Sequence, residues 1–219
     1  MTGSSKVIRL ADAQKGSARV SRAETIEPSE LVRALREGQP WAERIFLERE
    51  RGQVERILTR ILGWHSELDD LIQEVFTRAF ERIDELREPD ALRSWLSAIA
   101  VFVAREAIRR KRRRRWLIFL PPEETPDLTA ESTPPEARAA LRAFYEVVAT
   151  LEVDARIAFT LRCIGGLELS EIAEACDVSL ATIKRRIKRA ANDFYQRGRA
   201  HPELVDWFEE GTRWRQTES

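Results

Sequence analysis

The chain is poor in the residues that mark several large classes of protein. Its 219 residues include two cysteines, nine glycines and nine prolines. Such low glycine and proline contents exclude collagen-like and mucin-like chains. Cys163 and Cys176 stand alone, without the spacing of a disulfide framework or a metal site. A reducing compartment, the cytoplasm, is therefore the simplest location.

Long apolar runs are also missing. The longest nearly apolar stretch, 95–104, is about half as long as the roughly twenty residues that a membrane-spanning helix needs. Residues 1–15 are polar and mixed, unlike a secretory signal. We therefore expect no membrane insertion.

The residue patterns of common enzymes are absent as well. The sequence has no nucleophile paired with a base, no glycine loop for phosphate and no cluster of metal ligands, and its two histidines, His65 and His201, stand alone. We expect no catalytic residue, no metal site and no cofactor.

Charged residues, in contrast, make up 34% of the chain, above the roughly 25% of an average soluble domain. Acids and bases balance at 37 each, but they are segregated along the sequence. The net charge is −5 over 67–88, +8 over 93–115, −5 over 121–136 and +6 over 182–199. This alternation indicates several partners, or basic blocks that are shielded within the chain until a partner arrives.

Apolar residues recur at the three-four spacing of amphipathic helices through most of the chain, and no segment alternates like a strand. The sequence therefore predicts an all-α protein. Ser29 is expected to cap the first helix and Gly38 to end it. In the first half, we expect helices over 30–36, 41–49, 53–62, 68–83 and from 92 into the arginine-rich run 109–115.

A proline-rich acidic segment, 121–136, is the clearest candidate for a linker, because proline and like charges disfavour a packed helix. It divides the chain into two small helical domains. The predicted organisation is a flexible tail over 1–27, a first domain over 28–120, the linker over 121–136, a second domain over 137–199 and an acidic extension over 200–219.

The strongest local pattern is a helix-turn-helix over 169–189. Ser170 is expected to cap its first helix and Ser179 its second. Asp177 occupies the turn between them, where many such motifs have glycine. The second helix would bury apolar residues at helical spacing: Leu180, Ile183 and Ile187.

The outward residues of that second helix are polar or basic: Thr182, Lys184, Arg185, Arg186, Lys188 and Arg189. A helix fits the major groove of DNA, where such side chains bond base edges and phosphates. The alternative is a solvated charged face of a plain helical domain. The absence of acids before Asp193 favours DNA binding.

Several motifs in register now point to a family. DDLIQEVFTRAFERI is followed by SWLSAIA, an arginine cluster, a variable linker and LRxxxGLxxxEIA with TIKRRI. Over about residues 30–195 this arrangement resembles the extracytoplasmic-function sigma factors, the small two-domain initiation subunits of bacterial RNA polymerase. The resemblance implies a sigma region 2-like first domain, a region 4-like second domain, and core RNA polymerase and promoter DNA as partners. An anti-sigma factor is a further partner that the family commonly has.

The resemblance also implies roles for individual residues. The helix face of Asp70, Gln73 and Glu74 would dock on core polymerase, although an ordinary solvent face is the alternative. The second domain's helix would read the minus-thirty-five element as duplex. The minus-ten element would be opened by capture of a flipped base and held by Arg93, Trp95, Phe102, Arg105, Arg109, Arg110, Arg112 and Arg113.

One residue departs from the family pattern. Phe102 stands where asparagine commonly helps to recognise the flipped base, so it would stack on a base or pack inward. An atypical promoter is the expected consequence. Two other readings stay open: a conventional helix-turn-helix regulator with a sensing or dimerising first domain, and a degenerate sigma-like protein that binds polymerase without opening DNA. The acidic extension is expected to pack on a basic surface of the chain or on a partner, unless it is simply a frayed terminal helix.

Overall fold

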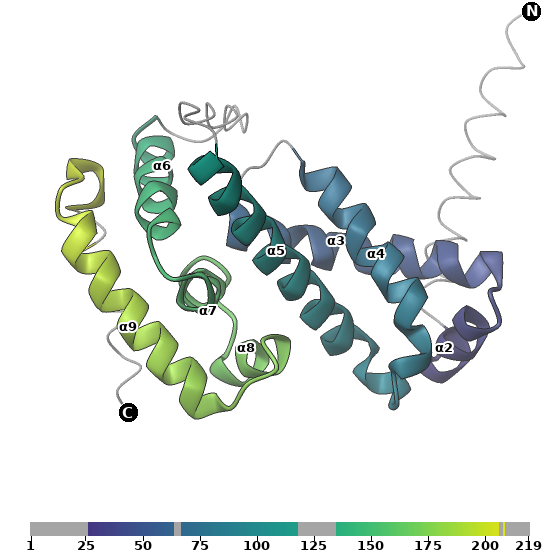
Figure 1. Ribbon diagram of the computed structural model, residues 1–219. Helices are drawn as coiled ribbons and strands as arrows, with labels where there is room; N and C mark the ends of the chain where they lie inside the picture. The colour runs from purple at the N-terminus through teal and green to yellow at the C-terminus, as the bar shows by residue number, and fades with distance from the viewer. Residues whose placement is uncertain (1–25, 64–66, 118–134, 206–207, 209–219) are drawn as a thin grey trace, which may run out of the picture.

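The computed structural model describes residues 26–63, 67–117, 135–205 and 208, and every regular element within these ranges is helical (Figure 1). The predicted all-α class is confirmed. The structure leaves residues 1–25 of the predicted tail, 121–134 of the predicted linker and most of the acidic extension outside its description.

The first four helices form the N-terminal module: α2 (Pro28–Arg36), α3 (Pro40–Leu62), α4 (Leu68–Arg82) and α5 (Leu92–Leu117). Two short 3₁₀ turns, η1 (Ile83–Glu85) and η2 (Pro89–Ala91), connect α4 to α5. Helices α3, α4 and α5 pack against one another around a cluster of phenylalanines. The ring of Phe46 meets Phe76 and Phe80 edge to face, with centroids 5.5 and 5.9 Å apart. Such pairs add stability beyond the area that they bury.

Helix α3 is continuous, whereas the sequence predicted two helices, over 41–49 and 53–62. The two predicted helices are joined through residues 50–52, which include Gly52. A glycine inside a helix costs about 1 kcal/mol relative to alanine. The fully buried residues on either side of it, including Phe46 and Val54, lie on one continuous apolar face of α3. Packing of that face outweighs the cost of the glycine.

The predicted cap of α2 is wrong. The helix begins at Pro28, and Glu27 is its N-cap residue, without a side-chain cap bond. Proline suits the first helical position because its fixed φ matches the helix and it has no N–H to satisfy. Ser29 therefore lies inside the first turn. The predicted end is confirmed, since Gly38 follows the C-cap residue Glu37 with φ at +66°.

The remaining elements form the C-terminal module: α6 (Pro135–Ala149), α7 (Val153–Cys163), α8 (Leu169–Ala175), α9 (Leu180–Gly198) and η3 (Pro202–Leu204). Helix α6 begins two residues inside the segment that we predicted as linker. The core of this module is a second aromatic cluster, in which the Phe194 ring lies 5.1 Å from that of Phe144 and 5.2 Å from that of Phe159.

Helices α8 and α9 form the predicted helix-turn-helix. Asp177 adopts the left-handed conformation expected in the turn, with φ at +52°. Ser179 caps α9 as predicted, because its Oγ accepts the Thr182 N–H at 3.2 Å. The predicted cap of α8 is wrong: Glu168 is the N-cap residue and exchanges bonds with Glu171 in a capping box. Ser170 lies within the helix.

The described part of the acidic extension belongs to the C-terminal core. Leu204 in η3 is fully buried, and the Phe208 ring lies 5.9 Å from Phe194 and 5.2 Å from Tyr195. A Cβ on Gly198 would come within 2.6 Å of Phe208 Cζ, so this close approach requires glycine. These contacts are apolar, and η3 packs against α6. Packing of the whole extension on a basic surface or on a partner stays a prediction.

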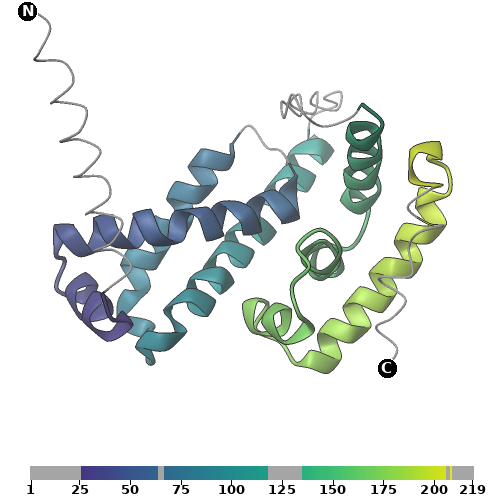
Figure 2. The same ribbon diagram turned by 180° about the vertical axis from the view of Figure 1, so that it is seen from behind.

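The two modules pack against each other. Helix α7 lies against α3 and α5, and α8 lies against α5. The two opposite views agree on this arrangement (Figures 1 and 2). One buried apolar cluster runs across the boundary and includes Ile61 of α3, Ile157 of α7 and Ile172 of α8. The sequence did not predict whether the modules associate.

Candidate nucleic-acid interface

Helix α4 presents the acidic face expected to dock on a partner. Asp70 and Gln73 are exposed, and Leu71 and Val75 beside them are buried. Glu74 is partly covered, because its carboxylate pairs with Arg78 Nη2 at 2.7 Å and with Arg110 Nη2 at 3.7 Å. The exposed part of the predicted docking face is therefore Asp70 and Gln73.

Arg78 connects the docking face of α4 with α5. Its guanidinium pairs with Glu74 and also with Glu106, with Nη2 2.7 Å from an oxygen of each carboxylate. It also lies over the Phe102 ring, 5.1 Å from the centroid, at a distance that favours a cation–π contact. Phe102 is 42% exposed. The sequence left open whether the Phe102 ring packs inward or lies outward, and in the structure it lies outward.

The first turn of α5 carries Arg93 and Trp95. The Arg93 side chain is 67% exposed, and its Nε donates to Gln53 and lies 3.7 Å from Glu50 Oε2. Glu50 is only 3% exposed and also pairs with Arg49. Arg93 is therefore paired with a buried carboxylate. Trp95 is partly buried against the core of the N-terminal module. Arg93 is therefore the more accessible of these two predicted DNA contacts.

The basic end of α5 is mostly exposed. Arg109, Arg112 and Arg113 are exposed, and Arg110 is partly covered by its pairing with Glu74. Arg105 is different, because its side chain is largely covered and its Nε lies 2.7 Å from Oδ1 of Asp154 on α7. The structure thus separates Arg105 from the exposed basic residues predicted to bind the minus-ten strand.

Helix α9, the second helix of the helix-turn-helix, exposes Lys184, Arg185, Lys188 and Arg189, and Thr182 is half-buried. The Thr182 hydroxyl lies 3.0 Å from that of Ser179 at the cap. The other face buries Ile183 and Ile187, as predicted. Leu180 was expected to be buried with them but is 45% exposed, because it occupies the first position of α9, where the helix leaves the core.

Arg186 pairs with α7 of its own module. Its Nη2 lies 3.1 Å from Asp154 Oδ2, so the same carboxylate holds Arg105 and Arg186. Asp154 was not among the predicted site residues, because nothing in the local sequence distinguishes it. An acid in the first turn of a helix is common because it suits the helix dipole.

Two more side chains of the C-terminal module reach the end of α3. Tyr145 donates its hydroxyl to the carbonyl oxygens of Thr59 and Arg60, each at 3.2 Å. Arg156 Nη2 donates to the Ile61 carbonyl at 3.1 Å. Burial lowers the pKa of Arg156 to about 10 and raises that of Tyr145 to about 12. At neutral pH Arg156 is still charged, and its positive charge suits the negative end of a helix dipole.

Both cysteines are shielded, which supports a packing role. Burial raises the pKa of the Cys163 thiol to about 12 and that of Cys176 to about 11. At pH 7.5 the reactive thiolate is therefore about 100- to 1,000-fold scarcer than in an ordinary thiol. We expect a disulfide reagent to label the folded chain very slowly and the guanidinium-unfolded chain rapidly. Fast labelling of either cysteine in the folded chain would contradict this.

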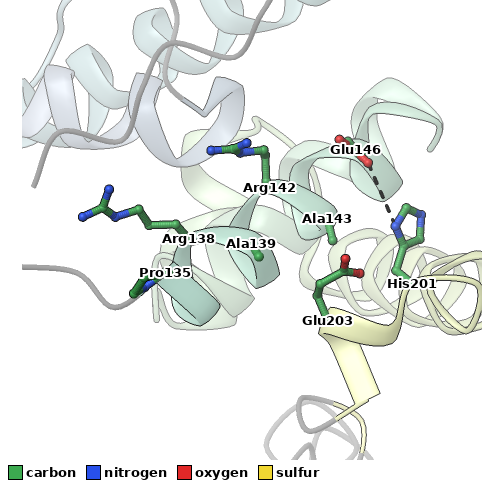
Figure 3. A pocket seen from close by; sticks show the side chains of 8 residues that line it. All are labelled: Pro135, Arg138, Ala139, Arg142, Ala143, Glu146, His201 and Glu203. Carbon is green, nitrogen blue, oxygen red and sulfur yellow. Dashed lines mark ion pairs between the residues drawn. The ribbon is translucent and has the colours of Figure 1, made fainter.

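No group of metal ligands occurs among the described residues, and no helix there is long and apolar enough to cross a membrane. A hollow of about 380 Å³ lies between α6 and η3 (Figure 3). It is lined by Pro135, Arg138, Ala139, Arg142, Ala143, Glu146, His201 and Glu203. His201 Nδ1 lies 4.0 Å from Glu146 Oε2 at its rim. The lining is open and mixed in charge, and it offers no nucleophile beside a base.

Comparison with known families gives two matches in the order of the modules. The model of Sigma-70 region 2 matches residues 46–114, and that of Sigma-70, region 4 matches 141–192. Together they cover more than half of the chain. The first lies within the N-terminal module and the second within the C-terminal one, including the helix-turn-helix.

Similar curated proteins span nearly the same length. The chain is 29% identical over 185 residues to the ECF RNA polymerase sigma-E factor of Haemophilus influenzae, covering 77% of this chain and 93% of that protein. The sigma-E factor of Escherichia coli K12 is 27% identical, with 77% and 92% covered. Among solved structures, CnrH in complex with the cytosolic domain of CnrY has a TM-score of 0.52 at 21% identity, covering 78% of this chain and 96% of that one.

Proposed function

Since the chain belongs to the extracytoplasmic-function sigma factors, which direct RNA polymerase to promoters, we propose a division of labour among three of its surfaces. The docking face of α4, which carries Asp70, Gln73 and Glu74, binds core polymerase. The basic end of α5 holds the opened minus-ten strand, and α9 reads the minus-thirty-five element. The factor acts as a regulatory subunit, and the polymerase carries out RNA synthesis.

The docking assignment is supported by the exposure of Asp70 and Gln73 beside a buried stripe. An amphipathic helix that leaves polar residues accessible next to its apolar face can bind a second helix without disturbing its own core. Glu74 contributes through its ion pair with Arg78, which fixes the side chains between α4 and α5. In this proposal Asp70 and Gln73 make the direct contacts and Glu74 orients its neighbours.

The DNA assignments are supported by the distribution of exposed cations. Four of the six residues proposed for α9 are exposed, as are Arg93, Arg109, Arg112 and Arg113 of α5. Exposed arginine and lysine side chains neutralise phosphates and release counterions, so binding should weaken steeply with salt. Phe102 lies outward beside Arg78 and is available to stack on an unpaired base. We propose that this contact replaces hydrogen-bond readout of the flipped base.

The cytoplasm is the compartment that this proposal requires, because the polymerase and the promoter are there. An anti-sigma factor remains a predicted partner class. The observation that carries the proposal is that α4 exposes Asp70 and Gln73, whereas α5 and α9 expose cations. A protein that only bound duplex DNA would have no use for the acidic face.

A charge reversal tests the docking face. We expect Asp70→Arg to lower the affinity for core polymerase about tenfold or more, which corresponds to about 1.4 kcal/mol. Affinity is measured by fluorescence anisotropy, and function by transcription from a library of promoter sequences. Glu81→Arg makes the same change at an exposed acid about three turns further along α4.

The outcomes separate the candidate functions. The proposal is supported if initiation is promoter-selective and requires core polymerase, and if Asp70→Arg loses it while Glu81→Arg keeps it. Sequence-specific duplex binding without any core affinity would instead identify a conventional regulator. Core binding without initiation at any promoter in the library would identify a degenerate sigma-like protein.

A further inference from the structure

One carboxylate joins two arginines from different modules. Asp154, in the first turn of α7, uses Oδ1 for Arg105 of α5 at 2.7 Å and Oδ2 for Arg186 of α9 at 3.1 Å. All three side chains are largely covered. Bonds from a guanidinium to a carboxylate are charge-assisted and stronger than neutral ones, particularly where water is excluded. Only the bond to Arg105 crosses the boundary between the modules, whereas the bond to Arg186 lies within the C-terminal module and orients the Asp154 carboxylate.

Both arginines belong to the sets assigned to DNA, one to the minus-ten strand and the other to the minus-thirty-five helix. A carboxylate offers the same two-oxygen geometry to a guanidinium as a phosphate does. We propose that Asp154 is an internal substitute for DNA phosphate. It pairs with Arg105 across the modules and with Arg186 within the C-terminal module, and so holds the free factor in a closed form that must open before Arg105 can bind promoter DNA. This inference rests on the proposed function, since it needs those arginines to be DNA contacts.

The closed form has a second attachment at the end of α3. Arg156 and Tyr145 of the C-terminal module bond three successive carbonyls, those of Thr59, Arg60 and Ile61. These carbonyls belong to the last turn of α3, where backbone carbonyls run out of donors within the helix; that of Thr59 also accepts the N–H of the C-cap residue Gly63 at 2.8 Å. Together with the apolar cluster that spans both modules, this attachment fixes how α7 lies on the N-terminal module. Asp154 is thus held in place opposite Arg105.

The same interface contains groups that gain from opening. Among the described side chains, Nη1 of Arg186 and Nε of Arg156 are buried without a hydrogen-bond acceptor. A buried donor without a partner is unfavourable relative to the same group in water. Opening would hydrate both groups or present them to phosphate oxygens. Because these donors gain partners on opening, a competing anion such as DNA can shift the chain from the closed form to the open one.

The direct test separates the modules by a single isosteric change, Asp154→Asn. Cysteines introduced at Glu55 of α3 and Gln196 of α9, both exposed, carry a donor and an acceptor dye. The shielded natural thiols stay unlabelled. We expect Asp154→Asn to lower energy transfer in the free chain. We also expect it to bind a fluorescein-labelled, random-sequence duplex about threefold to tenfold more tightly, because the fraction of the competent form rises.

The matched control is Glu174→Gln, which removes the same charge from an exposed position on α8 of the same module. It should leave energy transfer unchanged and alter DNA affinity less than Asp154→Asn does. Circular dichroism checks that both variants keep their helices. The proposal is overturned if Asp154→Asn leaves the transfer unchanged, or if the modules separate without any gain in DNA affinity over the control.

A failure of the proposed function would look different. Suppose that Asp154→Asn opened the chain and tightened duplex binding, but that neither the natural chain nor the variant initiated transcription with core polymerase. The closed form would then be supported, and the assignment of the surfaces to a sigma factor would be wrong. Conversely, normal initiation with no change in energy transfer would retain the function and remove the role of Asp154.

Discussion

Replacing Arg185 with alanine is expected to lower initiation from a promoter with an intact minus-thirty-five element by about 10- to 100-fold. Recognition helices contact base edges with their N-terminal residues, and Arg185 is an exposed residue in the second turn of α9. A good arginine–guanine pair contributes about 1–3 kcal/mol of discrimination. The loss should be measured as the rate of abortive product formation by holoenzyme reconstituted with each variant.

Arg199→Ala provides the control for this experiment. Arg199 is exposed just beyond the other end of α9, where its guanidinium lies 5.9 Å from the Tyr195 ring centroid. It lies outside the set assigned to DNA, so its replacement should change initiation little. Equal losses in both variants would show that α9 binds only as a diffuse positive charge. A promoter mutated at its minus-thirty-five element should lose its response to Arg185→Ala.

Replacing Phe194 with alanine is expected to cost about 3–5 kcal/mol of stability, the range for deletion of a buried aromatic ring. The side chain is fully buried, and its ring contacts three others, those of Phe144, Phe159 and Phe208. The surrounding rings could fill the cavity left by the Phe194 ring only by giving up their contacts with one another. The effect is measured from denaturant unfolding followed by circular dichroism.

Phe102→Ala is the matched control, because it removes the same ring from a partly exposed position on α5. Its effect on stability should stay within about 0.5 kcal/mol, as for most surface substitutions, while the loss of its ring should impair initiation. Equal destabilisation by the two variants would contradict the assignment of Phe194 to the core and of Phe102 to the surface.

The helical architecture could be predicted because it depends on local patterns. The three-four spacing gave the course of α5, and Asp177 and Ser179 marked the turn and the cap of the helix-turn-helix. The errors came where two local rules compete. Gly52 disfavours a helix, yet the apolar face of α3 continues through it. Ser170 is a good cap residue, yet Glu168, two residues earlier, takes that role in a reciprocal pair with Glu171.

The parts of the candidate site that escaped prediction depend on contacts distant in sequence. Arg105 and Arg186 look alike in sequence to their exposed neighbours, but the fold brings both to Asp154. Arg156 lies in an apolar run, where nothing indicates that its guanidinium reaches the end of α3. Helix periodicity reports which face of a helix is buried, but it does not report which module covers that face.

The polar attachment at the end of α3 couples the binding of core polymerase at α4 to the binding of promoter DNA by the parted modules, although the two use separate surfaces. Helix α3 packs directly against α4, so the helix that receives Tyr145 and Arg156 also supports the docking face. If parting the modules tightens the binding of core polymerase, thermodynamic reciprocity requires that core binding favour parting by the same factor. A change at the interface between the modules would then be measurable as a change in polymerase affinity, without any alteration of Asp70 or Gln73.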